Sequence, residues 1–109
     1  MSVIDEVLQE EYERSSRISA ALEAELAGLP RGSIRERVIK GKPYYYLQFR
    51  EGGHVRSRYV SRDEVGVLRS QLVRRKEVLA ALKEQKESRK KIERALGKEF
   101  AHGLSASGQ

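Results

Sequence analysis

The chain has 109 residues, of which 39% are hydrophobic and 35% charged, and this length is enough for one domain with a modest core. It contains no cysteine, which excludes a disulfide framework and a thiolate metal site. No apolar run approaches the ~20 residues of a membrane span, and the acidic N-terminus lacks the apolar stretch of a signal peptide. We therefore expect a cytoplasmic protein.

The net charge of +6 is unevenly distributed along the chain. Residues 1–30 carry seven acidic and two basic side chains, whereas residues 31–60 carry two acidic and eight basic ones. Residues 61–109 carry seven acidic and twelve basic side chains. A basic middle and end favour a polyanionic partner, usually nucleic acid, although such charges are also typical of an ordinary solvated surface.

The acidic segment 1–30 is predicted to contain a helix over residues 3–27. Ser2 suits the cap position, and Asp5 and Glu6 suit the positive end of the helix dipole. Gly28 and Pro30 end the pattern. Apolar residues recur at helical spacing at Ile4, Leu8, Tyr12, Ile18, Leu22 and Leu26.

The segment 31–61 is predicted to form a three-stranded antiparallel meander. Its three stretches, SIRERVIK, YYYLQFRE and HVRSRYV, are rich in β-branched and aromatic residues. We place the first turn at Gly41-Lys42 and the second at Gly52-Gly53, since a Gly-Gly pair favours a tight hairpin turn. In this register Arg35 opposes Gln48, Arg37 opposes Tyr46, and Tyr46 opposes Tyr59.

Alternation along these strands separates two faces of the sheet. The apolar face is a candidate core and comprises Ile34, Val38, Tyr45, Leu47, Phe49 and Val60, with Arg56 and Arg58 toward an edge strand. The other face is basic, aromatic and rich in hydrogen-bonding groups. It comprises Ser33, Arg35, Arg37, Tyr44, Tyr46, Gln48, Arg50, Ser57 and Tyr59.

The basic face has the chemistry of a nucleic-acid-binding surface. Arginines neutralise phosphates and make bidentate contacts to guanine, Gln48 suits adenine, and tyrosines stack on bases. The alternative is a solvated face on which arginine stems lie across the rings. We predict a binding site made of Arg35, Arg37, Tyr44, Tyr46, Gln48, Arg50, Ser57 and Tyr59.

Residues 62–100 are predicted to form a long helix, followed by a flexible tail over residues 101–109. Ser61 and Glu64 have the spacing of a capping box, in which the glutamate reaches back to the cap. The length of the helix argues for a partner, either the N-terminal helix or a second copy. Because apolar residues thin out beyond Lys83, we expect that half to be covered only by a second copy or a partner protein. The predicted partner or dimer positions are Leu68, Leu72, Leu79, Leu82, Ile92 and Leu96.

The sequence shows no set of residues that predicts a catalytic site. The two histidines, His54 and His102, fall in a turn and in the tail. No nucleophile elbow and no phosphate-binding glycine loop is present. We expect neither an enzyme nor a metal or cofactor site.

The middle of the chain resembles a family of short, uncharacterised bacterial and archaeal proteins. The shared motifs are Gly32-Ser33-Ile34, then Gly41 with Tyr44-Tyr45-Tyr46-Leu47-Gln48, then Arg50-Glu51-Gly52-Gly53, then Ser57-Arg58-Tyr59, followed by a long charged helix. In outline the same stretch is similar to the arm-DNA-binding domain of tyrosine recombinases and integrases, whose three-stranded sheet enters the DNA major groove. No catalytic recombinase domain follows it in this sequence.

These observations predict one domain of the α+β class, with an N-terminal helix, a three-stranded meander and a long C-terminal helix. The leading hypothesis is a small accessory or regulatory protein that binds nucleic acid, DNA rather than RNA, through one face of its sheet. The alternative is a protein-interaction module, such as an antitoxin-like or adaptor subunit, that clasps a partner through its helices.

Overall fold

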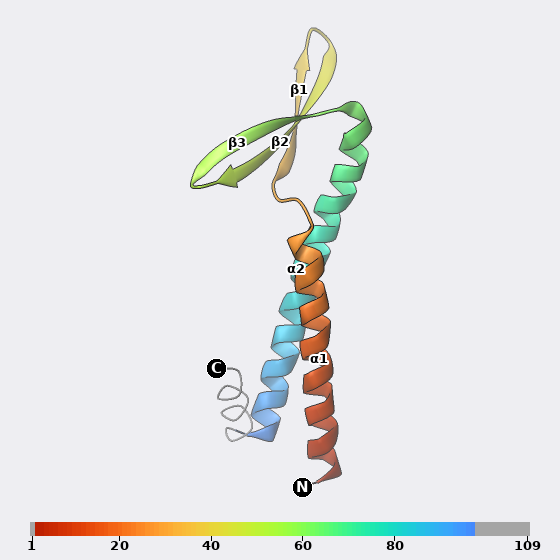
Figure 1. The fold of residues 1–109 in the computed structure, drawn as a ribbon, viewed down its shortest axis with the longest axis vertical. Coiled ribbons are helices and arrows are strands. Elements are labelled where there is room, and N and C mark those ends of the chain that lie inside the picture. Colours follow the sequence, from red (N-terminus) through yellow and green to blue (C-terminus); the bar gives the residue numbers. More distant parts are fainter. Residues whose placement is uncertain (1, 98–109) are drawn as a thin grey trace. The chain divides into compact units, whose positions relative to one another are not determined.

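The computed structural model describes residues 2–97 and confirms the predicted α+β fold (Figure 1). In chain order the elements are α1 (Val3–Ala27), β1 (Ser33–Ile39), β2 (Lys42–Glu51), β3 (His54–Val60) and α2 (Arg62–Leu96). The predicted tail at residues 101–109 lies outside the described residues. Among the helices described, none combines the length and the apolar composition needed to cross a membrane.

The chain divides into two compact units. One comprises Met1–Glu25 with Leu79–Gln109, and its described part is a pair of helical segments. The other, Leu26–Val78, contains the sheet and the first half of α2. We refer to them as the helical unit and the sheet unit.

Both helices begin at a serine cap. The Ser2 hydroxyl accepts a hydrogen bond from the backbone N–H of Asp5 at 3.2 Å, and Ser61 accepts one from the N–H of Glu64 at 3.3 Å. The predicted capping box is only half formed. The Glu64 carboxylate lies 3.7 Å from the Arg58 guanidinium, because β3 brings that cation next to the start of α2.

The sheet has the order β1-β2-β3 with both pairs antiparallel. The predicted β2–β3 register is confirmed, with Gln48 opposite Ser57 and Tyr46 opposite Tyr59. The predicted β1–β2 register is wrong by two residues, since Arg35 lies opposite Tyr46 and Arg37 opposite Tyr44. The turn is Lys40-Gly41, not Gly41-Lys42, and both of its residues take positive φ, 49° and 79°. A shift of two leaves every side chain on its expected face.

The core of the sheet unit lies between the sheet and α2. Leu47, Val60 and Leu68 are buried there, and Ile34, Tyr45, Phe49, Val65 and Leu72 pack around them. Two expectations need correction. Leu68 and Leu72, predicted at a partner or dimer interface, pack against the sheet of their own chain. Val38, predicted in the core, is 65% exposed because β1 continues beyond the part that α2 covers.

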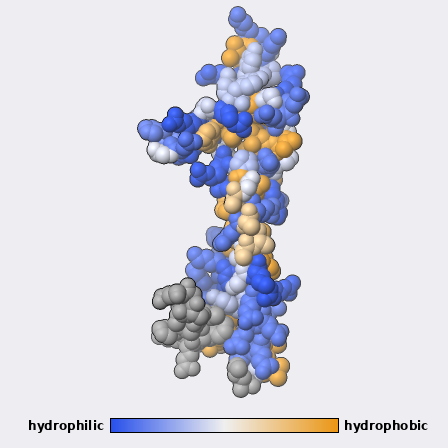
Figure 2. Space-filling model, in the orientation of Figure 1, coloured by the Kyte–Doolittle hydropathy of each residue, from blue (hydrophilic) through white to orange (hydrophobic). Residues whose placement is uncertain are grey.

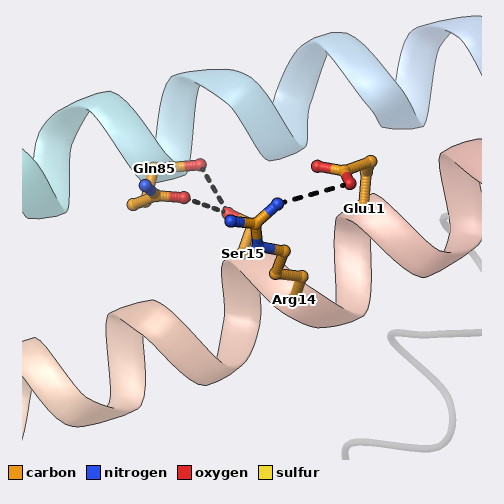
Figure 3. A network of polar contacts seen from close by, with 4 residues as sticks. All are labelled: Glu11, Arg14, Ser15 and Gln85. Carbon is orange, nitrogen blue, oxygen red and sulfur yellow. Dashed lines mark hydrogen bonds and ion pairs between the residues drawn. The ribbon is translucent and has the colours of Figure 1, made fainter.

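In the helical unit, α1 packs against the second half of α2, so the N-terminal helix is the partner (Figure 1). Ser15 and Ser19 are its most buried residues. Figure 3 shows Ser15 facing Gln85, to which it donates at 2.7 Å, while Arg14 pairs with Glu11 on the same helix. The expectation that this half of α2 is covered only by another molecule is therefore wrong.

The charged residue Arg89, in the second half of α2, is part of this interface. One Nη group of Arg89 lies 2.6 Å from the Ser19 hydroxyl, 3.1 Å from the Ser15 hydroxyl and 3.2 Å from the Ser15 carbonyl. We call the contacts among Ser15, Ser19, Gln85 and Arg89 the polar layer of the helical unit. The remaining predicted partner positions lie on α2 before and after it. Leu82, Ile92 and Leu96 are partly buried, whereas Leu79 is 45% exposed.

Candidate nucleic-acid interface

The face of the sheet opposite the core is the candidate site, and we call it the outward face. Its members follow from the two registers and the alternation along each strand. All eight predicted binding residues lie on it: Arg35, Arg37, Tyr44, Tyr46, Gln48, Arg50, Ser57 and Tyr59. Four further residues share it: Ser33, Ile39, Lys42 and Val55.

The carboxylates of the described strands all lie on one face of the sheet. The outward face carries the four cations Arg35, Arg37, Lys42 and Arg50 and no carboxylate. The strand carboxylates, Glu36 opposite Tyr45 and Glu51 opposite His54, occupy positions of the other face. Figure 2 shows hydrophilic residues over much of the visible surface around the strands. The outward face is thus uniformly positive, although the chain mixes both signs.

Two side chains on this face hold each other in place. The Arg35 Nε–H donates to the Gln48 side-chain oxygen at 3.1 Å. Together they border a shallow hollow of about 290 Å³, which is lined by Arg35, Glu36, Arg37, Tyr46, Gln48 and Ser57. The bond uses Nε and leaves both Nη groups out of it, so the fork edge of the guanidinium stays available for a planar acceptor such as a phosphate.

The tyrosines form a second feature of the outward face. Tyr46 and Tyr59 sit directly opposite each other, with ring centroids 6.0 Å apart and an interplanar angle of 73°. Tyr59 is 56% exposed, so much of its surface is open to a stacking base. A second hollow of about 350 Å³ lies nearby and is lined by Lys42, Pro43, Tyr44, Tyr45, Tyr59, Val60 and Arg62.

Two cations on the helix side of the sheet unit have partners within the protein. Arg58 pairs with Glu64, and the Arg69 guanidinium lies 5.5 Å from the ring centroid of Tyr45. Among the described residues, the arginines of the outward face form no ion pair with a carboxylate, although Glu36 lines the hollow beside Arg35 and Arg37. Sequence reasoning missed Lys42 as a member of the outward face, because it was assigned to the turn. Placing that turn one residue earlier would have found it.

Gly32 directly precedes β1 and lies close to the backbone of β2 at Gln48. Its φ of +119° is one that residues with a side chain rarely adopt. A Cβ at this position would also overlap the backbone carbonyl oxygen of Gln48 and lie 3.1 Å from Cβ of Phe49. Close approach of the chain at Gly32 therefore positions the strand that carries Gln48, which explains the glycine of the Gly-Ser-Ile motif.

Comparison with known proteins gives one match. No curated protein and no solved structure matches the chain significantly, so these comparisons show no link to recombinase arm-binding domains. The model of a family described as a domain of unknown function, DUF6788, matches residues 8–70, which run from α1 through the whole sheet into α2. The match covers more than half of the 109 residues. The resemblance to an uncharacterised family is thereby confirmed, and the chain belongs to the DUF6788 family.

Proposed function

We propose that the outward face binds nucleic acid, duplex DNA in preference to RNA, and that the protein acts as an accessory or regulatory factor. One observation carries the proposal. The outward face gathers four cations and three tyrosines without a carboxylate, although 16 acidic residues are present in the chain. An ordinary solvated face mixes both signs of charge, whereas a phosphate-binding face excludes the negative one.

The residues of the face suit both positioning and recognition. Arg35, Arg37 and Arg50 would neutralise phosphates or contact guanine edges, and Gln48 would pair with adenine where it is released from Arg35. Three strands spaced about 4.8 Å apart make a surface roughly 10 Å wide, which suits a major groove ~12 Å wide. The likeness of the motifs to recombinase arm-binding domains agrees with this mode of binding and supports it by analogy.

The test is a fluorescence anisotropy titration of the protein with random-sequence duplex DNA and RNA over a range of salt concentrations. The variant Arg35→Ala/Arg37→Ala/Arg50→Ala should bind more weakly, with a salt dependence flatter by roughly one unit per lost phosphate contact. The matched control is Lys83→Ala/Lys86→Ala/Lys90→Ala, which removes the same charge from exposed positions of α2. Equal affinity losses in both variants, or no binding by the parent at low salt, would exclude the outward face.

A second candidate function is suggested by the start of α1. Val3, Ile4 and Val7 are 75%, 71% and 52% exposed and form one apolar patch at the start of a helix that is rich in acidic residues. Such a patch suits an interaction with a partner protein, as in an antitoxin-like or adaptor subunit. In that case Val3→Ser/Ile4→Ser/Val7→Ser would abolish complex formation with the partner and leave nucleic-acid binding unchanged.

A further inference from the structure

We infer that the tip of the β1–β2 hairpin is an apolar wedge that opens a base step of duplex DNA and bends it. The wedge consists of Val38 and Ile39, which directly precede the turn on opposite faces of the hairpin, and its basic surround consists of Arg37, Lys40 and Lys42. The inference rests on the proposed function, and it adds deformation of the bound DNA to simple contact. It concerns the end of the hairpin, beyond the hollow at Arg35 and Gln48.

Exposure is the first observation. Val38 is 65% exposed and Ile39 43% exposed, although both are β-branched residues in a paired strand. From Arg35 to Ile39 every residue of β1 is exposed. At about 3.4 Å per residue, this stretch extends roughly 14 Å, which exceeds the depth of either DNA groove. The hairpin is therefore long enough for its tip to reach the bases while Arg35 remains at the backbone.

Stiffness is the second observation. Pairing continues to the end of the hairpin, with Val38 opposite Pro43 and Ile39 opposite Lys42. The connection is a two-residue turn, Lys40-Gly41, with φ of 49° and 79°, as in the type I′ turns that match the twist of paired strands. A side chain inserted between bases must resist the restacking of those bases. A tightly paired tip gives that resistance better than a long loop would.

The second hairpin of the same sheet provides an internal comparison. It too has a two-residue turn with positive φ, Gly52-Gly53, and an exposed apolar residue, Val55. Its tip, however, carries Glu51 and His54 and lacks lysine and arginine, whereas the first tip carries Lys40 and Lys42. Two turns of the same geometry thus differ in the charge next to the turn: the first has lysines there, whereas the second has Glu51 between its turn and Arg50.

Some DNA-bending proteins insert apolar side chains that lie next to basic ones. In such proteins a side chain such as isoleucine or leucine partly unstacks one base step, while cations hold the neighbouring phosphates. A wedge of this kind binds more tightly wherever the step is already weakened, because less stacking is lost. That preference distinguishes a wedge from an apolar residue that merely lies in a groove.

The experiment uses a DNA duplex of about 30 base pairs, which carries a fluorescent donor and acceptor at its ends, with and without a central mismatch. We expect the parent to increase energy transfer, as a bend of about 20–90° brings the ends together, and to bind the mismatched duplex at least about five-fold more tightly. Val38→Thr/Ile39→Thr keeps the β-branched shape and should lose both effects. The matched control, Val73→Thr at an exposed position of α2 outside the outward face, should behave as the parent.

The outcomes separate this inference from the proposed function. If the parent binds the duplex in a salt-dependent way but neither bends it nor prefers the mismatch, the wedge proposal is wrong. Nucleic-acid binding by the outward face is then still supported. If the Val38→Thr/Ile39→Thr variant bends DNA as the parent does, the wedge is also wrong. If the parent binds no nucleic acid at low salt, both fail together. Circular dichroism of each variant confirms that the fold is retained.

Discussion

Arg35 on β1 and Gln48 on β2 are diagonal neighbours on the outward face, and the arginine Nε–H donates to the glutamine oxygen at 3.1 Å. The bond holds the guanidinium through its Nε, so the role of Arg35 depends on geometry as well as on charge. Lysine keeps the charge but lacks the Nε–H and the planar fork.

Arg35→Lys should therefore weaken nucleic-acid binding and leave its salt dependence nearly unchanged. Loss of a bidentate contact corresponds to about 1–3 kcal/mol of binding free energy, whereas the number of neutralised phosphates stays the same. Anisotropy titrations at several salt concentrations measure both quantities. An Arg35→Lys variant that binds as tightly as the parent would show that Arg35 acts as a simple cation.

Substitutions of the adjacent residues Tyr46 and Leu47 test which face of the sheet packs in the core and which binds nucleic acid. Leu47 is 5% exposed in the core, whereas Tyr46 belongs to the outward face. Leu47→Ala should lower the free energy of unfolding by about 2–5 kcal/mol, and Tyr46→Ala should lower it by less and impair nucleic-acid binding more. Urea denaturation combined with binding titrations measures both effects. The reverse order of the two stability losses would mean that the faces are inverted.

Two glycines of the sheet unit should respond in opposite directions to the same substitution. Gly32→Ala places a methyl group against the Gln48 carbonyl at a φ of +119°, so a loss of about 1–3 kcal/mol or more is expected. Gly66 lies inside α2 with no atom within 4 Å of an added Cβ, so Gly66→Ala should gain about 0.5–1 kcal/mol. Thermal unfolding of the two variants measures the difference. A neutral Gly32→Ala would refute the close approach.

The successes and errors of sequence reasoning have identifiable physical causes. The faces of the sheet were predictable because strand alternation survives a register error of two, so Arg35 and Arg37 kept their face. The turn was misplaced because Lys40 takes a positive φ that the sequence assigns more readily to glycine. Arg89, which lies in the half of α2 where apolar residues thin out, was not identified from the sequence as part of an interface. Its acceptors, Ser15 and Ser19, are 70 or more residues away, and local periodicity carries no information about such a pair.

The polar layer of the helical unit also includes a titratable group, Tyr12, whose hydroxyl donates to the Glu93 carboxylate at 2.9 Å. Burial raises the pKa of Tyr12 above its ordinary value of 10.0, and the hydrogen bond to Glu93 and the repulsion by its charge raise that pKa further. The charge of Arg89 acts in the opposite direction. The neutral phenol is thus favoured in the folded state.

A raised pKa in the folded state means that the contribution of Tyr12 to stability is complete below pH 10 and is lost as the pH rises through the folded value. Tyr12→Phe should lower the free energy of unfolding by about 0.5–1.5 kcal/mol at neutral pH, since Glu93 loses its donor. The difference between parent and variant should then shrink above pH 10, because the ionised phenol donates no hydrogen bond and repels Glu93. Chemical denaturation of both proteins from pH 7 into the alkaline range measures this difference, and Tyr59→Phe on the outward face controls for alkaline effects elsewhere. A Tyr12→Phe variant as stable as the parent at neutral pH would show that Tyr12 stabilises the helix pair by packing alone, because phenylalanine keeps the ring and loses only the hydroxyl.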